Sequence, residues 1–172
     1  MLRDLASSAE LEQRASAAMR RVCDQGWTIS TAESCTGGLV SALLTDIEGC
    51  SHAFDRGFVA YTEDAKTDLL GVDPAVLAKK GAVSKDVALA MAEGGLRHSK
   101  AHITLAVTGF AGPTGIEGEE GLVHFALAMR NRPTRHEMHR FGTMGRDAIR
   151  HLSVLTLLEM LESVVSSDGT PA

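Results

Sequence analysis

Aromatic residues and cysteines are scarce in this chain. Phe, Trp and Tyr together make up 4% of its 172 residues, with 1 Trp and 1 Tyr, so the core has to be built mainly from aliphatic side chains. The 3 cysteines, Cys23, Cys35 and Cys50, are odd in number and show no C-x-x-C spacing. They therefore indicate neither a disulfide framework nor a zinc-binding knuckle.

Long apolar runs and an excess of positive charge are missing as well. The first residues include Arg3, Asp4 and Glu10, which differ from the apolar core of a signal peptide, and no run is long enough to span a bilayer. The formal net charge is −5, a poor fit to non-specific binding of nucleic acid or of a membrane surface. We therefore expect a cytoplasmic protein that associates with neither.

Hydrophobic residues make up 44% of the chain, enough for one domain with a sizeable core. We expect this domain over residues 1–165 and a disordered tail over residues 166–172. Apolar spacing and turn residues predict helices over 5–25, 36–45, 62–71, 74–81, 85–97 and 145–165, and strands over 27–32, 54–61, 102–108, 122–129 and 134–141. Helices on both sides of a mixed sheet would bury it, so we expect an α/β fold.

The most informative segment is residues 31–38, which read Thr-Ala-Glu-Ser-Cys-Thr-Gly-Gly at a predicted strand-to-helix turn. Ser34 and Thr36 bring hydroxyls to this turn, and two glycines allow unusual backbone angles and the close approach of another group. The first N–H groups of a helix have no partner inside it and favour negative charge. The segment fits a nucleophile beside an oxyanion site, and it equally fits a phosphate site.

Two neighbours of Ser34 have alternative interpretations. Cys35 would be the better nucleophile if the helix N-terminus lowered its pKa, but no histidine is near it in sequence. Adjacent side chains diverge, so we expect only one of the two to face the site. Glu33 is expected to cap the helix or to pair with a cation rather than to act as a general acid.

A serine nucleophile needs a base, and the residues alone do not identify one. None of the 7 histidines lies in a triad motif, and G-x-S-x-G is absent. His136 and His139 would face opposite sides of a strand, so we expect no metal site there. Lys66 follows the second strand, but its pKa would have to fall from roughly 10.4 to about 7–8. On these grounds alone a solvated lysine is the better interpretation.

The strand over 102–108 ends in Thr108 and is followed by Gly109 and Gly112. Ligands of open α/β sheets bind beyond the carboxyl ends of strands, which would bring Thr108 close to Ser34. A turn that simply needs glycine is an equally good interpretation. Arginines gather at 130, 132, 135 and 140, and we interpret this basic cluster as a solvated hairpin.

Taken together, these segments resemble the motifs of the CinA C-terminal domain family. Residues 31–38 resemble its signature, residues 54–66 its next motif, and residues 81–84 and 107–113 two more. Arg146 and Arg150 match basic residues early in the family's last helix. The motifs follow in the family's order from about residue 8 to 165, and the resemblance implies a three-layer αβα sandwich with a mixed sheet.

Stand-alone members of that family are nicotinamide-nucleotide amidohydrolases, which convert nicotinamide mononucleotide to nicotinate mononucleotide and ammonia in pyridine nucleotide salvage. The resemblance therefore implies a serine amidohydrolase that needs neither metal nor cofactor. It makes Ser34 the nucleophile and Lys66 the base, with Tyr61 and Thr108 orienting the pair or relaying protons. The implied substrate- and oxyanion-binding residues are Cys35, Thr36, Gly37, Gly38, Gly109, Gly112, Arg146 and Arg150, the two arginines being candidates for the 5′-phosphate.

The chain departs from the family pattern in two places. Glu119-Glu120 stands where many relatives have Lys-Pro, and Met144-Gly145-Arg146 replaces a common Gly-Asp-Arg. A carboxylate near a phosphate is unfavourable, so an amidase for another amide stays open. So do a catalytically silent nucleotide-binding module and a protein-interaction domain, the latter hinted at by the family's competence- and damage-inducible naming. We also expect a homo-oligomer.

Overall fold

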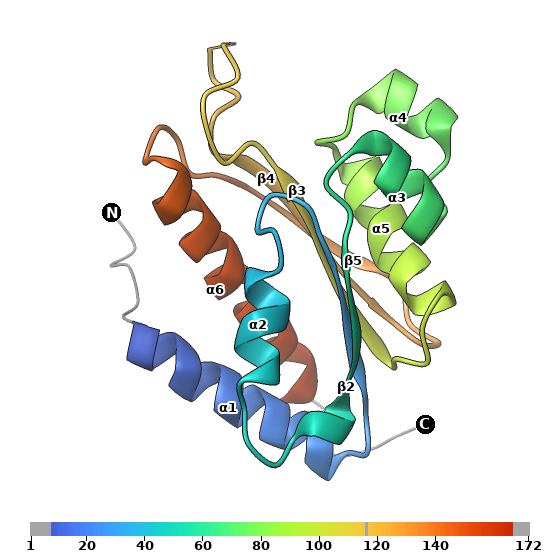
Figure 1. Ribbon diagram of the computed structural model, residues 1–172, viewed down its shortest axis with the longest axis vertical. Coiled ribbons are helices and arrows are strands. Elements are labelled where there is room, and N and C mark those ends of the chain that lie inside the picture. Colours follow the sequence, from blue (N-terminus) through green and yellow to red (C-terminus); the bar gives the residue numbers. More distant parts are fainter. Residues whose placement is uncertain (1–7, 116, 167–172) are drawn as a thin grey trace.

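The computed structural model describes residues 8–115 and 117–166 (Figure 1). Five strands form one mixed sheet in the order β2 (Phe54–Val59), β1 (Ile29–Glu33), β3 (Ile103–Gly109), β4 (Leu122–Met129) and β5 (Arg135–Arg140). β1 runs parallel to β2 and β3, while β4 is antiparallel to both of its neighbours. The tail expected over 166–172 lies outside the described residues, apart from Ser166.

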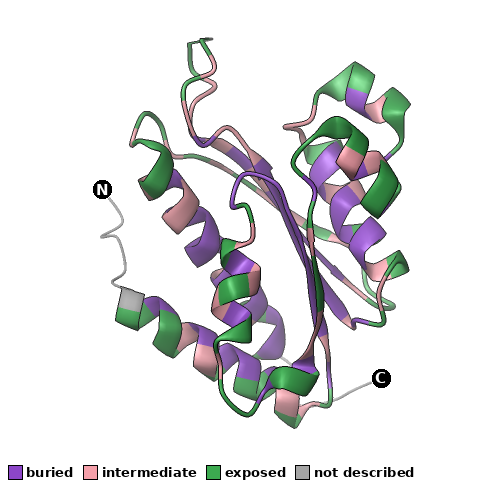
Figure 2. Cartoon of the chain, in the orientation of Figure 1, coloured by how far each residue is buried: buried purple, intermediate pink, exposed green. Residues whose placement is uncertain are grey.

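Helices cover both faces of this sheet, which confirms the three-layer αβα sandwich (Figures 1 and 2). One face carries α1 (Ser8–Asp24), α2 (Leu39–Thr45) and α6 (Arg146–Val165), and the other carries α3 (Glu63–Leu70), α4 (Pro74–Lys80) and α5 (Lys85–Arg97). A short 3-10 turn, Ser51–Ala53, precedes β2. None of the helices within these described residues is long and apolar enough to cross a membrane.

The two faces of the sheet are filled differently. Large side chains such as Ile103, Leu105 and Phe125 point toward α1, α2 and α6, whereas Ala106, Ala126 and Ala128 point toward α5. This alternation is the period-2 pattern of a strand that is buried on both sides. The alanines let α5 and its neighbour α3 lie close to the sheet, and α3 is the helix that carries Lys66.

Two predicted boundaries need correction, the first at the turn over residues 34–38, which carries the candidate nucleophile Ser34 and which we call the nucleophile turn. The helix expected over 36–45 begins at Leu39, because Gly37 and Gly38 have φ angles of 62° and 97°, in the left-handed region that a right-handed helix does not contain. The strand expected over 54–61 ends at Val59. Ala60 and Tyr61 then leave the strand, which frees their carbonyl oxygens for the contacts described below.

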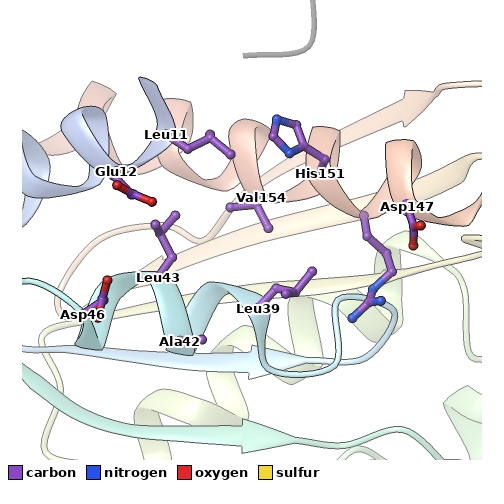
Figure 3. Close-up of a pocket in the computed structure, with 10 residues that line it drawn as sticks. Leu11, Glu12, Leu39, Ala42, Leu43, Asp46, Asp147, His151 and Val154 are labelled. Carbon is purple, nitrogen blue, oxygen red and sulfur yellow. The ribbon is translucent and has the colours of Figure 1, made fainter. Parts of the chain in front are cut away.

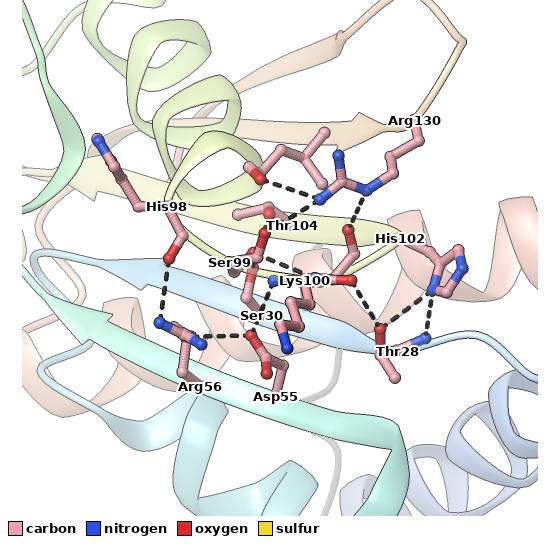
Figure 4. A network of polar contacts seen from close by, with 12 residues as sticks. Thr28, Ser30, Asp55, Arg56, His98, Ser99, Lys100, His102, Thr104 and Arg130 are labelled. Atoms are coloured by element: carbon pink, nitrogen blue, oxygen red, sulfur yellow. Dashed lines mark hydrogen bonds and ion pairs between the residues drawn. The ribbon is translucent and has the colours of Figure 1, made fainter.

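The opposite end of the sheet is fastened by a polar network around the loop between α5 and β3 (Figure 4). Arg130 donates to the carbonyl oxygens of Ala101, Leu96 and Ser99 at 2.8, 3.2 and 3.1 Å. His102 Nδ1 accepts from the N–H of Thr28 at 3.0 Å. One member of the basic cluster thus binds backbone carbonyls rather than standing free in solvent.

We expect Gly94→Ala to lower the free energy of unfolding. A Cβ atom at Gly94 would overlap the carbonyl oxygen of Leu70, the last residue of α3, and this backbone atom has no flexible end that can move aside. The overlap should cost about 2–3 kcal/mol and outweigh the gain in helix propensity. Urea denaturation measures it, with Gly112→Ala as the control, because a Cβ atom there meets nothing within 4 Å. A neutral Gly94→Ala would contradict close α3–α5 packing.

Candidate active site

Ser34 lies at the carboxyl edge of the parallel strands. It directly follows β1, and its N–H donates to the carbonyl of Val107 in β3 at 3.0 Å, so the turn is held by the neighbouring strand. The residue is 7% exposed. Ser34 and Thr108 therefore lie at the same edge of the sheet, which agrees with one of the two interpretations that the sequence left open, although the Thr108 hydroxyl donates to the carbonyl of Ala82 at 2.8 Å.

Lys66 reaches Ser34 from α3 and is 1% exposed. Its Nζ is 3.0 Å from Ser34 Oγ, 3.0 Å from the carbonyl oxygen of Ala60 and 3.1 Å from that of Tyr61. Burial lowers the pKa of Lys66 from its usual value, while Cys35 and Glu63 act in the opposite direction. The interpretation of Lys66 as a solvated lysine is wrong, because α3 places it on the buried face together with Leu70.

The three contacts of Nζ define how a neutral Lys66 is oriented. Carbonyl oxygens only accept hydrogen bonds, so Ala60 and Tyr61 each take one N–H. A neutral amine has two N–H groups and one lone pair, so the lone pair is left facing Ser34 Oγ. This geometry allows the neutral amine to accept the Ser34 proton, and the resulting ammonium ion has an acceptor for each of its three protons.

Cys35 is adjacent to Ser34 but lies in a different environment. Its thiol is 5% exposed, and burial raises its pKa to about 12, only partly opposed by the N–H groups of Cys35 and Thr36. A thiol with this pKa is protonated at neutral pH and is a poor nucleophile. The condition under which Cys35 would be the better nucleophile, a pKa lowered by the helix N-terminus, is therefore not met.

Glu33 takes the N-terminal amides of α2. One carboxylate oxygen accepts from Thr36 Oγ1 at 2.7 Å, from the N–H of Gly38 at 3.0 Å and from that of Val40 at 3.1 Å. The other accepts from the N–H and the hydroxyl of Ser41 at 2.8 and 2.6 Å. Glu33 thus caps the helix, as one of its sequence interpretations predicts. Its negative charge occupies the position in which a phosphate would sit.

This capping corrects the set of expected oxyanion donors. The N–H of Gly38 is used by Glu33, and the N–H of Gly37 donates to the carbonyl of Ser34 at 3.1 Å. Within the described residues, the N–H groups of Cys35 and Thr36 donate to no oxygen atom. The N–H of Cys35 directly follows the candidate nucleophile Ser34, which is where serine hydrolases commonly place an oxyanion donor.

The remaining predicted site residues lie around this centre rather than on it. The Tyr61 side chain is 59% exposed, and its hydroxyl is 3.4 Å from Nη2 of Arg146. Nη2 of Arg150 donates to the carbonyl of Thr36 at 2.9 Å, so this arginine supports the nucleophile turn. A Cβ atom at Gly109 would crowd Val123, whereas Gly112 has open space around it.

Histidines take no part in this centre. Ser34 Oγ contacts Lys66 and no histidine within the described residues. His136 stacks on His124, while His139 stacks on Phe141, which confirms that His136 and His139 face opposite sides of β5. No group of three or more His, Cys, Asp or Glu side chains in the described parts is arranged to hold a metal ion.

Comparison with known sequences assigns the chain to a family. The family described as CinA C-terminal domain matches residues 11–165. The chain belongs to the CinA C-terminal domain family. A "Putative competence-damage inducible protein" of Acetivibrio thermocellus is 44% identical over 166 residues, covering 95% of this chain and 40% of that protein. A protein of the same description from Symbiobacterium thermophilum is 52% identical over 115 residues, 66% of this chain and 27% of its own length. The chain thus spans less than half the length of these curated relatives.

Solved CinA structures share the fold over nearly their whole length. The competence/damage inducible protein CihA of Agrobacterium tumefaciens superposes with a TM-score of 0.86 at 46% identity, covering 91% of this chain and 96% of that one. A CinA superfamily protein of Escherichia coli gives a TM-score of 0.86 at 30% identity, covering 95% of this chain and 94% of that one. These descriptions name no reaction.

Sequence reasoning missed two parts of the centre. The carbonyl oxygens of Ala60 and Tyr61 carry no side-chain signal, because any residue has such an atom. Ser41 was not singled out either, although its place early in the predicted helix would have marked it as a partner for a capping carboxylate.

We expect Glu33→Gln to destabilise the protein. The glutamine amide keeps one acceptor oxygen but replaces the other with an NH₂ group. That group would face N–H donors that bind a carboxylate oxygen in the wild type, at a position that is 0% exposed. The loss should be about 2–4 kcal/mol, because hydrogen bonds to a buried charged group are strong and unpaired buried donors are costly. Urea denaturation measures it, with the exposed Glu63→Gln as the control. Equal stability of both variants would show that the capping network contributes little.

Proposed function

We propose that this protein is a metal-independent serine amidohydrolase that converts nicotinamide mononucleotide to nicotinate mononucleotide and ammonia. The observation that carries the proposal is the buried Lys66 amine, 3.0 Å from Ser34 Oγ and held by two backbone carbonyls. A buried amine with a lowered pKa, aimed at a hydroxyl, is suited to remove its proton. The substrate class rests on the family resemblance.

The reaction consists of two acyl transfers. Ser34 Oγ attacks the carboxamide carbon as Lys66 takes its proton, and the oxyanion forms against the N–H groups of Cys35 and Thr36. The C–N bond then breaks, and the leaving nitrogen receives the proton from Lys66 and departs as ammonia. Water, deprotonated by the neutral Lys66, attacks the ester, and the proton returns to Ser34 as the carboxylate product leaves. One effective oxyanion donor is worth about 3–4 kcal/mol of barrier.

The arginines divide between the substrate and the nucleophile turn. Arg150 already donates to the carbonyl of Thr36, while Arg146 is exposed and its guanidinium lies 3.4 Å from the Tyr61 hydroxyl. We therefore assign the 5′-phosphate to Arg146. The exposed ring of Tyr61 lies beside it and offers a surface for the nicotinamide ring.

Ammonia release from nicotinamide mononucleotide, with a chelator present, tests the assignment. Wild type should turn over, and Ser34→Ala and Lys66→Met should each lose roughly 10³-fold or more, because they remove the nucleophile and its base. Cys35→Ala is the matched control and should stay within about tenfold of wild type, because the thiol is buried and protonated. A folded wild type without turnover would overturn the substrate assignment, and the same assay would then be run on other amides. An active Ser34→Ala would overturn the mechanism.

The pH dependence of kcat/KM tests the role of Lys66 separately. Only the neutral amine accepts a proton, and burial lowers the pKa of Lys66 below its usual 10.5. We therefore expect kcat/KM to fall as the pH drops through this lowered pKa, and to level off above it while the pH is still below 10.5. A profile that keeps rising up to the ordinary lysine pKa would contradict a desolvated base.

A further inference from the structure

A separate cleft opens on the other side of the nucleophile turn, between α1, α2 and α6 (Figure 3). Its volume is about 580 Å³, within the range that encloses small organic ligands. Leu11, Leu39, Leu43 and Val154 supply its apolar lining. Neither Ser34 nor Lys66 lines it, so we call it the α1–α2–α6 cleft and treat it as distinct from the active site.

The charges around the cleft are mainly negative. Glu12, Asp46 and Asp147 line it, with the guanidinium of Arg150 as the opposing charge. Within residues 8–115 and 117–166 none of these three carboxylates is in an ion pair, and all three are exposed. A smaller cleft of about 210 Å³ shares Glu12 and Asp46 and adds Glu48 and Arg20, so the end nearest these residues is the acidic one.

Arg150 connects the cleft with the nucleophile turn. It lines the cleft, and its Nη2 donates to the carbonyl of Thr36 at 2.9 Å. Its Nε is buried and has no hydrogen-bond partner among the described residues, so Arg150 uses only part of its hydrogen-bonding capacity. A ligand that displaces the side chain would therefore disturb the turn at modest cost.

We propose that the α1–α2–α6 cleft binds a small organic cation with an apolar body, such as an arylalkylamine. The leucines and Val154 accept the apolar body, and the Glu12–Asp46 end accepts the ammonium group. An anion of the same shape is disfavoured by the three carboxylates. Occupancy reaches the nucleophile turn through Arg150. Binding itself does not depend on the proposed amidohydrolase activity, whereas any effect on turnover rests on it.

Titrations of the ¹⁵N-labelled full chain with three probes test the binding. The probes are 4-phenylbutylamine, 4-phenylbutanoate with the same body but opposite charge, and butylamine with the charge alone. The first should shift amides of α2 and of residues 147–154 in a saturable way, with a Kd at least tenfold lower than either other probe. Equal binding of the amine and the carboxylate, or shifts confined to other elements, would overturn the proposal.

Substitution of the acidic end provides the matched comparison. Glu12→Gln combined with Asp46→Asn should raise the Kd for 4-phenylbutylamine at least fivefold, and both residues are exposed, so the fold should persist. Glu63→Gln with Asp64→Asn is the control pair, because these acids lie on α3 across the sheet and should leave the Kd unchanged. An unchanged Kd in the Glu12→Gln, Asp46→Asn variant would show that these two carboxylates do not bind the ammonium group.

The link through Arg150 has its own readout. In wild type, 4-phenylbutylamine should also shift the amides of Thr36 and Gly37, and Arg150→Gln should abolish these shifts while those of α2 remain. Shifts at the turn that persist in Arg150→Gln would overturn the coupling. Because the measurement follows amides and not ammonia, it gives an answer even if the protein does not hydrolyse nicotinamide mononucleotide.

Discussion

The structure of the site depends on the buried carboxylate of Glu33. It accepts hydrogen bonds from three N–H groups at the start of α2 and from the hydroxyls of Thr36 and Ser41, more contacts than any other group makes to this segment among the described residues. This leaves the N–H groups of Cys35 and Thr36 as donors next to Ser34. The negative charge of Glu33 thereby occupies the N-terminus of α2, where a bound phosphate would otherwise sit.

The environment of Lys66 is formed by packing between segments that are distant from it in sequence. Gly94 in α5 has no side chain, so the end of α3 at Leu70 packs directly against α5, and Lys66 and Leu70 are the buried residues of α3. Burial then disfavours the charged amine, and the carbonyls of Ala60 and Tyr61 orient it. Ser34 and Lys66 thus come from two short segments, each following a parallel strand, and are positioned with helices on opposite faces of the sheet.

Local patterns predicted most of the fold but not the state of Lys66. Periodicity and glycines placed every α-helix and strand of the described residues but not the 3-10 turn before β2, and one boundary error arose where the left-handed Gly38 overrode the pattern. The capping role of Glu33 could be anticipated because all its partners lie within residues 36–41. Burial of Lys66 could not be anticipated, because it depends on how α3 packs against segments distant in sequence, such as the turn that carries Ser34. Only the family resemblance pointed to Lys66 as the base, and no side chain in the sequence indicates the backbone carbonyls that orient its amine.

The position of α6 as the last described element also determines when the domain can finish folding during synthesis. Ser34 and Lys66 lie early in the chain, yet α6 follows every other element and buries 12 side chains, which complete the core under β3 and β4 and pack against α1. Until residue 165 has left the ribosome, α1 and α2 can pack on this face of the sheet, but the part that α6 covers stays exposed, although Ser34 and Lys66 were made long before. A nascent chain therefore contains Ser34 and Lys66 before the framework that positions them is complete, and aggregation through the exposed part of that face is the hazard of this interval.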